Sequence, residues 1–217
     1  MHKSIANLSF IKEQIKTKFD STDNLNIIAV SKTFTITEIE PLLKHGHLHF
    51  GENKIQEALD KWTNVKNKFE NVKLHMIGKL QSNKAKFLIP LFDYLHSLDN
   101  IKLAEKISKE QIKLKKKIKI FIQVNIADES QKNGIQINEL KSFYNTCVNQ
   151  LDLNIIGLMC LPPVNMEVRP FFKKMKELKD QLKLKELSMG MSSDYLEAIE
   201  FGSSFIRVGS KIFGKRV

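Results

Sequence analysis

Residues 25–32 read LNIIAVSK, an almost unbroken apolar run that passes directly into a lysine. A run of this kind is typical of a β-strand that other structure covers on both faces, as in a parallel sheet. We therefore expect a buried first strand at residues 25–31, with Lys32 at its carboxyl end. Seven more short β-rich segments follow, at residues 48–51, 73–78, 94–98, 118–125, 154–159, 186–190 and 205–209.

Segments with helical spacing of their apolar residues alternate with these strands. Strict alternation of strand and helix favours a parallel sheet, and eight repeats in a chain of this length favour its closure into a barrel. The expected fold class is α/β, a single (β/α)8 TIM-type barrel with an extra N-terminal helix, in which residues 1–217 form one domain. The expected helices are residues 4–19, 37–44, 54–68, 101–113, 137–150 and 169–183.

The composition is that of an ordinary globular protein, with 42% hydrophobic and 27% charged residues among 217. The formal net charge of +11 comes mostly from lysines in the helical segments. Such charge runs are more often solvated helix faces than nucleic-acid sites, so we expect no specific nucleic-acid partner. Cys147 and Cys160 have neither disulfide nor zinc-site spacing. Because no signal peptide or membrane helix is recognisable, we expect a cytoplasmic protein without membrane contact. We also expect a monomer.

Polar residues gather at the carboxyl ends of the expected strands, where barrels of this type build their sites. Lys32 follows the first strand and Asn53 follows the second. A lysine at a strand end is most often simply solvated. If it faces the mouth of the barrel, burial disfavours the ammonium form, and the free amine can attack an aldehyde to form an imine.

Two glycine- and serine-containing segments follow the seventh and eighth strands, at residues 188–192 and 208–210. Their backbone N–H groups and hydroxyls could surround a phosphate, as the loops at this place in barrels often do. Once the barrel closes, these strand ends lie beside Lys32. Arg207 is the only arginine within an expected strand; it either pairs with a carboxylate or faces the ring nitrogen of an aromatic cofactor.

The histidines raise the alternative of a metal site, because His45, His47 and His49 alternate along the chain. Alternation places strand side chains on one face, but no carboxylate or cysteine completes a ligand set. We therefore expect ordinary surface or packing histidines and no metal. His75 is expected in mid-strand, where packing with a satisfied hydrogen bond is commoner than catalysis.

Six segments resemble the pyridoxal phosphate homeostasis proteins, and they occur in the order found in that family. They are AVSKT (29–33), FGEN (50–53), HMIGKLQSNK (75–84), GLM (157–159), SMGMSSD (188–194) and RVGSKIFG (207–214). The resemblance implies the fold of the N-terminal barrel of bacterial alanine racemase. It also implies that Lys32 holds pyridoxal 5′-phosphate (PLP) as a Schiff base.

The same resemblance implies the other cofactor contacts. Ser192, Gly209 and Ser210 would bind the phosphate, with Ser188 and Met191 near it. Arg207 would approach the pyridine nitrogen and Asn53 would lie close to the ring. An arginine in place of a carboxylate leaves that nitrogen unprotonated, which weakens the ring as an electron sink.

The expected function is non-catalytic: binding of PLP in cellular PLP (vitamin B6) and amino-acid homeostasis, with delivery to PLP-dependent apoenzymes. The racemase needs a second domain that supplies a catalytic tyrosine, and this chain ends at Val217. Tyr94, Tyr144 and Tyr195 are the tyrosines that could replace it, and Tyr195 follows the expected phosphate loop. A PLP-dependent racemase or another Schiff-base enzyme therefore stays open as the alternative, and a nucleic-acid-binding module as the third.

Overall fold

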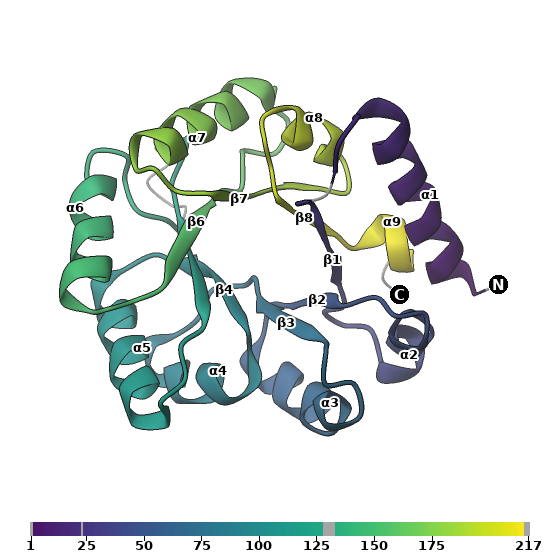
Figure 1. Ribbon diagram of the computed structural model, residues 1–217, viewed down its shortest axis with the longest axis horizontal. Helices are drawn as coiled ribbons and strands as arrows, with labels where there is room; N and C mark the ends of the chain where they lie inside the picture. The colour runs from purple at the N-terminus through teal and green to yellow at the C-terminus, as the bar shows by residue number, and fades with distance from the viewer. Residues whose placement is uncertain (1, 23, 128–132, 215–217) are drawn as a thin grey trace.

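Eight parallel strands close into a barrel in the computed structural model, which describes residues 2–22, 24–127 and 133–214. Each strand pairs with the next along the chain, and β8 pairs with β1 (Figure 1). The predicted fold class is confirmed. The strands are Asn26–Val30 (β1), His49–Glu52 (β2), Lys73–Met76 (β3), Tyr94–Leu98 (β4), Lys119–Gln123 (β5), Ile155–Met159 (β6), Glu186–Met191 (β7) and Phe205–Val208 (β8).

Helices cover the outside of the barrel, and α1 (Lys3–Lys18) lies beside both α9 and α2, near the meeting point of the first and last strands (Figure 1). An Asn7 amide donates to the Ile212 carbonyl at 2.9 Å and ties α1 to α9. The other helices are Ile36–Lys44 (α2), Ile55–Lys68 (α3), Ala85–Leu91 (α4), Ile101–Leu114 (α5), Leu140–Asn145 (α6), Arg169–Gln181 (α7), Tyr195–Glu200 (α8) and Ser210–Phe213 (α9).

Several helical segments differ from the sequence-based expectation. The helix expected at residues 137–150 begins only at Leu140 and widens into a π-helical turn over Thr146–Gln150. It begins late because Ile135 still pairs with β5, its N–H donating to the Gln123 carbonyl at 2.8 Å. The short helices α4, α8 and α9 were not expected. The almost wholly apolar sequence of α4 has no amphipathic pattern and contains Pro90, yet it buries Leu88.

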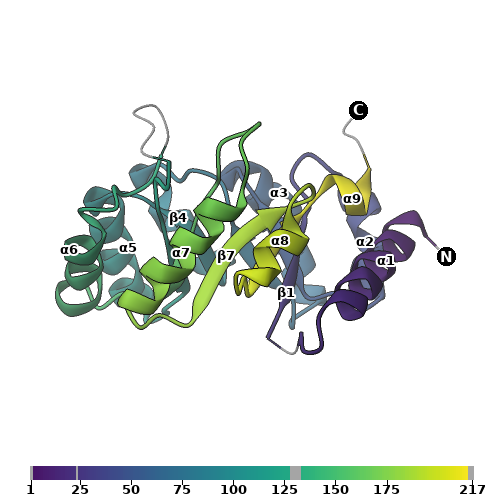
Figure 2. The ribbon, with the colours of Figure 1, turned by 90° about the horizontal axis from the view of Figure 1, so that it is seen from above.

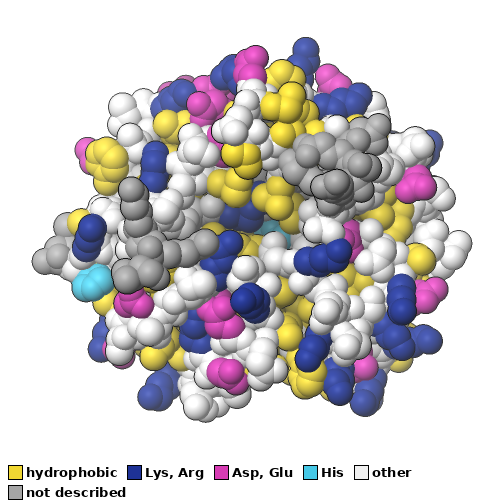
Figure 3. Space-filling model, turned by 180° about the vertical axis from the view of Figure 1, so that it is seen from behind, with side chains coloured by type: hydrophobic (Ala, Val, Ile, Leu, Met, Phe, Trp, Pro, Cys, Tyr) yellow, Lys and Arg dark blue, Asp and Glu magenta, His cyan; other side chains and the backbone are white. Residues whose placement is uncertain are grey.

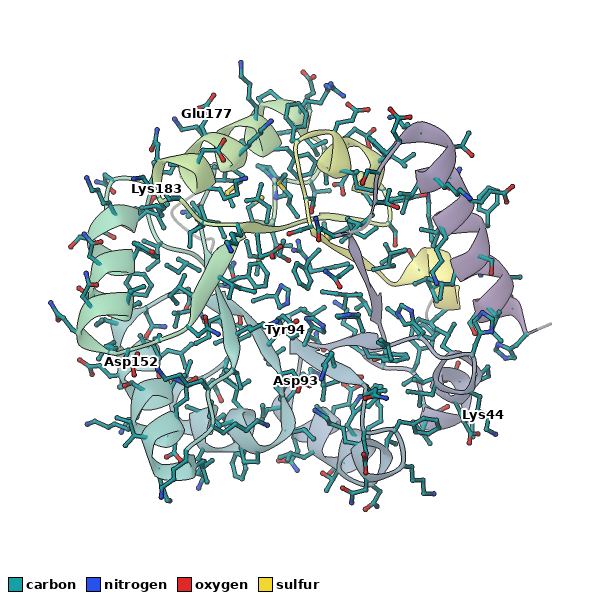
Figure 4. The ribbon with its side chains drawn as sticks, viewed as in Figure 1. Lys44, Asp93, Tyr94, Asp152, Glu177 and Lys183 are labelled. Atoms are coloured by element: carbon teal, nitrogen blue, oxygen red, sulfur yellow. The ribbon has the colours of Figure 1, made fainter. Side chains whose placement is uncertain are left out.

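The core has two parts because neighbouring strand residues face opposite sides of the sheet. Ile27 and Ala29 belong to the large cluster between the strands and the helices. Ile28 belongs instead to a small cluster inside the barrel, whose other buried members are Tyr94, Phe121, Met159 and Phe205. Figure 4 shows Tyr94 projecting into the ring of strands. The lumen is therefore a packed interior and not a channel.

The strands run toward the end of the barrel at which α9 lies (Figure 2). The loop between β6 and α7 projects at this end. None of the helices in the described part of the chain is long and apolar enough to cross a membrane.

Candidate functional site

A cavity of about 660 Å³ opens at the carboxyl ends of the strands. It combines hydrophobic and cationic side chains with the glycine–serine loops, and Figure 3 shows the hollow at the centre of this face. A second cavity, of about 600 Å³, lies at the opposite end between α1 and the starts of β1 and β2. The first cavity is the candidate site because its polar groups converge from different strands. Its lining is Val30, Lys32, Phe34, Asn53, Ile77, Gly78, Leu161, Met191, Ser192, Ser193, Arg207, Gly209, Ser210 and Gly214.

Lys32 reaches this cavity because it lies an even number of residues beyond Ile28, which faces the lumen. Its side chain is partly buried at the mouth. The chain turns sharply after it: Thr33 has a φ of +70°, which few non-glycine residues adopt. The Thr33 N–H donates to Glu57 on α3 at 2.6 Å, so a hydrogen bond to a neighbouring helix holds this turn.

A buried carboxylate, Glu52, holds the ends of β1 and β2 against α3. Its Oε1 accepts from Ser31 at 2.7 Å, from the indole of Trp62 at 2.9 Å and from Lys61 at 3.0 Å. Burial raises the pKa of Glu52 despite these bonds, because desolvation outweighs the pairing with Lys61. The side chain faces α3 and not the lumen, and its bond to Ser31 joins the residues that directly precede Asn53 and Lys32.

The segments after β7 and β8 meet at the cavity. The Gly209 N–H donates to the Ser192 hydroxyl at 3.3 Å, and the Met191 N–H donates to Asp194 at 2.6 Å. Gly190 has a φ of +91°, and the pairing of β7 with β8 shifts register between Ser188 and Met191. This irregularity turns Met191 and Ser192 toward the cavity. Two sequence segments that are 17 residues apart thereby form one continuous wall.

Arg207 has no carboxylate partner in the described part of the chain. This excludes, for the described residues, the ion pair that the sequence left open. Its guanidinium donates to the Ser188 carbonyl at 2.8 Å, the Ser188 hydroxyl at 2.6 Å and the Cys160 carbonyl at 2.9 Å. The side chain is 5% exposed and lines the cavity. Neutral acceptors leave its positive charge uncompensated at close range, so this wall of the cavity favours an electron-rich group.

Asn53 lines the same cavity, directly after the end of β2. Its Oδ1 is buried without a hydrogen-bond partner. Gly78 approaches its backbone so closely that a Cβ at Gly78 would lie 2.3 Å from the Asn53 carbonyl oxygen. Only glycine fits there, and the contact holds Asn53 at the cavity wall. A buried acceptor without a partner in a cavity is a site that a ligand donor can satisfy.

The structure brings seven of the eight expected cofactor contacts to this one cavity: Lys32, Asn53, Met191, Ser192, Arg207, Gly209 and Ser210. Ser188 is the exception. It is fully buried in mid-strand and lies against Arg207 instead of lining the cavity. Ile77 and Leu161 line the cavity but were not expected to do so, since single apolar residues carry no distinctive signal in one sequence.

The tyrosines do not line this cavity. Tyr195 is 1% exposed, and its hydroxyl donates to Gln14 on α1 at 2.6 Å. Burial raises its pKa. Tyr195 is thus a packing residue between α8 and α1, even though it follows the phosphate-type loop in sequence. Tyr94 lies in the lumen, stacked on His75 with 4.2 Å between ring centroids.

The histidines that alternate in sequence, His45, His47 and His49, all line the cavity near α1, but no group of metal-binding side chains forms among the described residues. His47 is buried, and a ring nitrogen bonds the His49 carbonyl at 2.9 Å. His49 and His75 enter the lumen and bond each other at 2.9 Å. His75 also bonds His96, which the sequence did not single out. The signal for His96 was its place in β4, two residues after the lumen residue Tyr94.

The chain matches the family described as "Alanine racemase, N-terminal domain" over residues 6–217. A curated relative, the pyridoxal phosphate homeostasis protein of Haemophilus influenzae, is 35% identical over 224 residues, which cover 97% of this chain and 94% of the relative. The protein of the same name from Escherichia coli K12 is 34% identical, covering 90% of this chain and 88% of the relative.

The chain is also similar to solved structures. PipY of Synechococcus elongatus PCC7942 without PLP has a TM-score of 0.87 and 31% identity, and covers 98% of this chain and 100% of PipY. The structure of PipY with PLP bound has a TM-score of 0.86. The alanine racemase of Clostridium difficile 630 has a TM-score of 0.72 at 16% identity, and the match covers 57% of that chain. This last likeness shows the fold alone.

Proposed function

Because this chain belongs to the alanine racemase N-terminal domain family, and within it to the pyridoxal phosphate homeostasis proteins, we propose that it binds PLP as a Schiff base on Lys32. One observation carries the proposal: Lys32, Arg207 and the loops after β7 and β8 converge on a single cavity. These residues come from the two ends of the sequence, and the pairing of β1 with β8 brings them together.

The residues present fit this cofactor. A cavity of about 660 Å³ lies within the usual range for small-molecule sites. The donor set combines an amine for an aldehyde, hydroxyls and N–H groups for a phosphate, and a cation for an aromatic nitrogen. The unpartnered Asn53 oxygen can accept from a bound hydroxyl. When bound, PLP supplies the aldehyde and an electron-withdrawing ring.

In this proposal, each group of lining residues contacts one part of the cofactor. Lys32 forms the covalent link. Ser192, Gly209 and Ser210 bind the phosphate, with Met191 beside them. Arg207 faces the ring nitrogen and Asn53 the ring. Ser188 would not contact the cofactor itself. Its hydroxyl and carbonyl accept hydrogen bonds from Arg207 and so hold that side chain in place.

We propose further that the chain is a carrier and not an enzyme, and that it supplies PLP to PLP-dependent apoenzymes. An arginine at the ring nitrogen cannot hold a proton on that nitrogen as a carboxylate does, so the ring is a weaker electron sink. Moreover, the described part of the chain places no tyrosine at the cavity to act as a racemase base. The monomeric state and the cytoplasmic location stay predictions from the sequence.

The test is a spectrum of the purified protein with added PLP, before and after reduction with borohydride. We expect the visible band of a Schiff base, and after reduction a PLP adduct that mass spectrometry places on Lys32. Lys32→Ala should lose the adduct completely while keeping weaker, non-covalent binding. The matched control is Lys211→Ala, since the Lys211 ammonium lies 4.9 Å from the Tyr195 ring, outside the cavity lining.

Two outcomes would contradict the proposal. A wild-type protein without the visible band at saturating PLP would exclude the Schiff base. An adduct that persists in Lys32→Ala would assign the linkage to another lysine. For the carrier role, exchange of the α-proton of added amino acids at an enzymatic rate, lost in Lys32→Ala, would show that the protein is a catalyst.

A further inference from the structure

A continuous hydrogen-bonded chain runs through the lumen and ends at Arg207. His49 Nδ1 lies 2.9 Å from His75 Nε2, and His75 Nδ1 lies 2.9 Å from His96 Nε2. His96 Nδ1 lies 2.8 Å from the Ser188 hydroxyl, which lies 2.6 Å from an Arg207 nitrogen. The chain connects five strands and links the cavity near α1, which His49 lines, to the candidate cofactor cavity, which Arg207 lines.

Aromatic and aliphatic side chains enclose the middle of this chain. His75, His96 and Ser188 are fully buried. His75 stacks on Tyr94, and His96 stacks on Phe121 with 4.4 Å between ring centroids. Burial lowers the pKa of His75 and of His96 well below the ordinary value, and it lowers the pKa of His49 to about 4. Each ring is therefore neutral at neutral pH, with one nitrogen that donates and one that accepts.

Arg207 determines which nitrogen carries each hydrogen. A guanidinium has only donors, so the Ser188 oxygen must accept from Arg207. The Ser188 hydroxyl then donates to His96 Nδ1, the one remaining acceptor within its reach among the bonds of the described residues. His96 must carry its hydrogen on Nε2 and donate to His75 Nδ1, and His75 in turn donates from Nε2 to His49 Nδ1. Every bond in the chain points away from Arg207.

We propose that His96 is a positioning residue for the cofactor site: through the Ser188 hydroxyl it fixes the orientation of Arg207, and His75 and His49 stabilise the one tautomer that permits this. The inference rests on the proposed function for its relevance to PLP, but the direction of the chain is a property of the protein alone. The charged or titratable groups that face His96 are Arg207, His75 and His49, and those that act on Arg207 are Cys160 and Asp194.

The orientation of Arg207 depends on this chain because no carboxylate in the described residues fixes the guanidinium. Two carbonyls and one hydroxyl hold it instead. If His96 is replaced by an apolar residue, the Ser188 hydroxyl loses the acceptor for its hydrogen. That hydrogen can then turn toward the Arg207 N–H group, and two donors that face each other repel. The cation should therefore move away from the cofactor ring.

The first experiment uses the protein without PLP and measures the ¹⁵N shifts of the histidine side chains by NMR. We expect His49, His75 and His96 to be neutral, with hydrogen on Nε2 and none on Nδ1. Ser188→Ala should remove the constraint and allow the other tautomer at His96. A wild-type His96 with hydrogen on Nδ1 would overturn the inference, whether or not the protein binds PLP.

The second experiment follows the visible band of the PLP-loaded protein as a function of pH. A cation near the ring lowers the pKa of the Schiff base, so a displaced Arg207 should raise the midpoint of the transition. We expect His96→Leu to raise it by about half a pH unit, roughly threefold in the proton equilibrium. His96→Asn should restore the wild-type midpoint, because its amide oxygen can replace Nδ1 as the acceptor for Ser188.

Phe121→Leu is the control for packing, since it alters the ring against which His96 stacks but removes no hydrogen bond from the chain. We expect its midpoint to equal that of the wild type. Equal midpoints in His96→Leu and the wild type, or equal shifts in Phe121→Leu and His96→Leu, would overturn the inference. Absence of the band in the wild type would instead contradict PLP binding and leave the NMR result to decide the direction of the chain.

Discussion

At the scale of the residue, Gly190 determines the shape of the wall that we assign to the phosphate. It lies at the end of β7 with a φ of +91°, in the left-handed region that glycine adopts without cost. A Cβ at this position would lie 2.6 Å from the Ala198 Cβ on α8. Glycine is therefore required twice, for the backbone conformation and for the close approach of α8.

Gly190→Ala should reduce the free energy of unfolding by about 3 kcal/mol, from backbone strain and overpacking together. It should also weaken PLP binding, because Met191 and Ser192 follow directly. Gly202→Ala is the matched control: Gly202 has a φ of +83°, but a Cβ added there would meet no atom within 4 Å. The stability lost in Gly202→Ala should be about 1 kcal/mol, from strain alone. Urea unfolding of both variants measures the difference, and equal losses would contradict the role of the Ala198 contact.

At the scale of the element, β1, β2 and α3 meet at two carboxylates that share Lys61. Glu52 and Glu57 each lie 3.0 Å from its ammonium. Burial raises the pKa of Glu52. Burial also acts to raise the pKa of Glu57, but the hydrogen bonds from Thr33 and Lys61 lower it overall. The two carboxylates should therefore contribute to stability with opposite dependence on pH.

Glu52→Gln tests this for the buried group. Because the folded protein holds the Glu52 proton more tightly than the unfolded chain does, wild-type stability is lost as the pH rises above 4.5, by at most about 1.4 kcal/mol per pH unit. The variant lacks this loss, so its free energy of unfolding relative to the wild type should rise with pH. Glu57→Gln should show the opposite trend, since the lowered pKa of Glu57 stabilises the fold above 4.5. Parallel curves for the two variants in urea unfolding would contradict the assignment.

At the scale of the whole molecule, the lumen of the barrel contains a line of hydrogen-bonded histidines, which apolar and aromatic side chains surround. His47, His49, His75 and His96 all have a pKa below the ordinary value of 6.5, chiefly because burial disfavours the charged imidazole. The folded barrel therefore binds fewer protons than the unfolded chain below pH 6.5. Stability that these groups contribute at neutral pH is lost as the pH falls toward about 4, the folded value for His47 and His49.

We expect the four histidines to lower the free energy of unfolding by about 5 kcal/mol between about pH 7 and about pH 5.5, of which the raised pKa of Glu52 offsets at most about 2 kcal/mol. That is a large share of the ordinary stability of a domain, so the protein should unfold in mild acid. Urea titrations across this range measure the loss, and their slope gives the protons taken up on unfolding. His47→Asn should reduce the uptake by about one proton. A free energy that is unchanged between the two pH values would contradict the neutral histidines.

Much of the site could be read from the sequence, because its chemistry lies in short local segments. The apolar run that ends at Lys32 and the glycine–serine segments after β7 and β8 each predict a strand end, and strand ends of one barrel meet at one face. The alternation of strand and helix similarly predicted the closed parallel sheet. The short helix α4 was missed, since an apolar segment without helical periodicity is stabilised only by what it packs against.

The sequence by itself thus determined the barrel and the face that carries the candidate site, because periodicity and strand ends are local properties. The resemblance to a known family then implied which residues would contact the cofactor. Only the tertiary structure decided the partner of Arg207, the packing role of Tyr195 and the lumen chain from His49 to Ser188. These depend on which side chains of distant strands meet when the sheet closes. Lys32 and Arg207 are 175 positions apart in sequence, and the pairing of β1 with β8 makes them neighbours in one cavity.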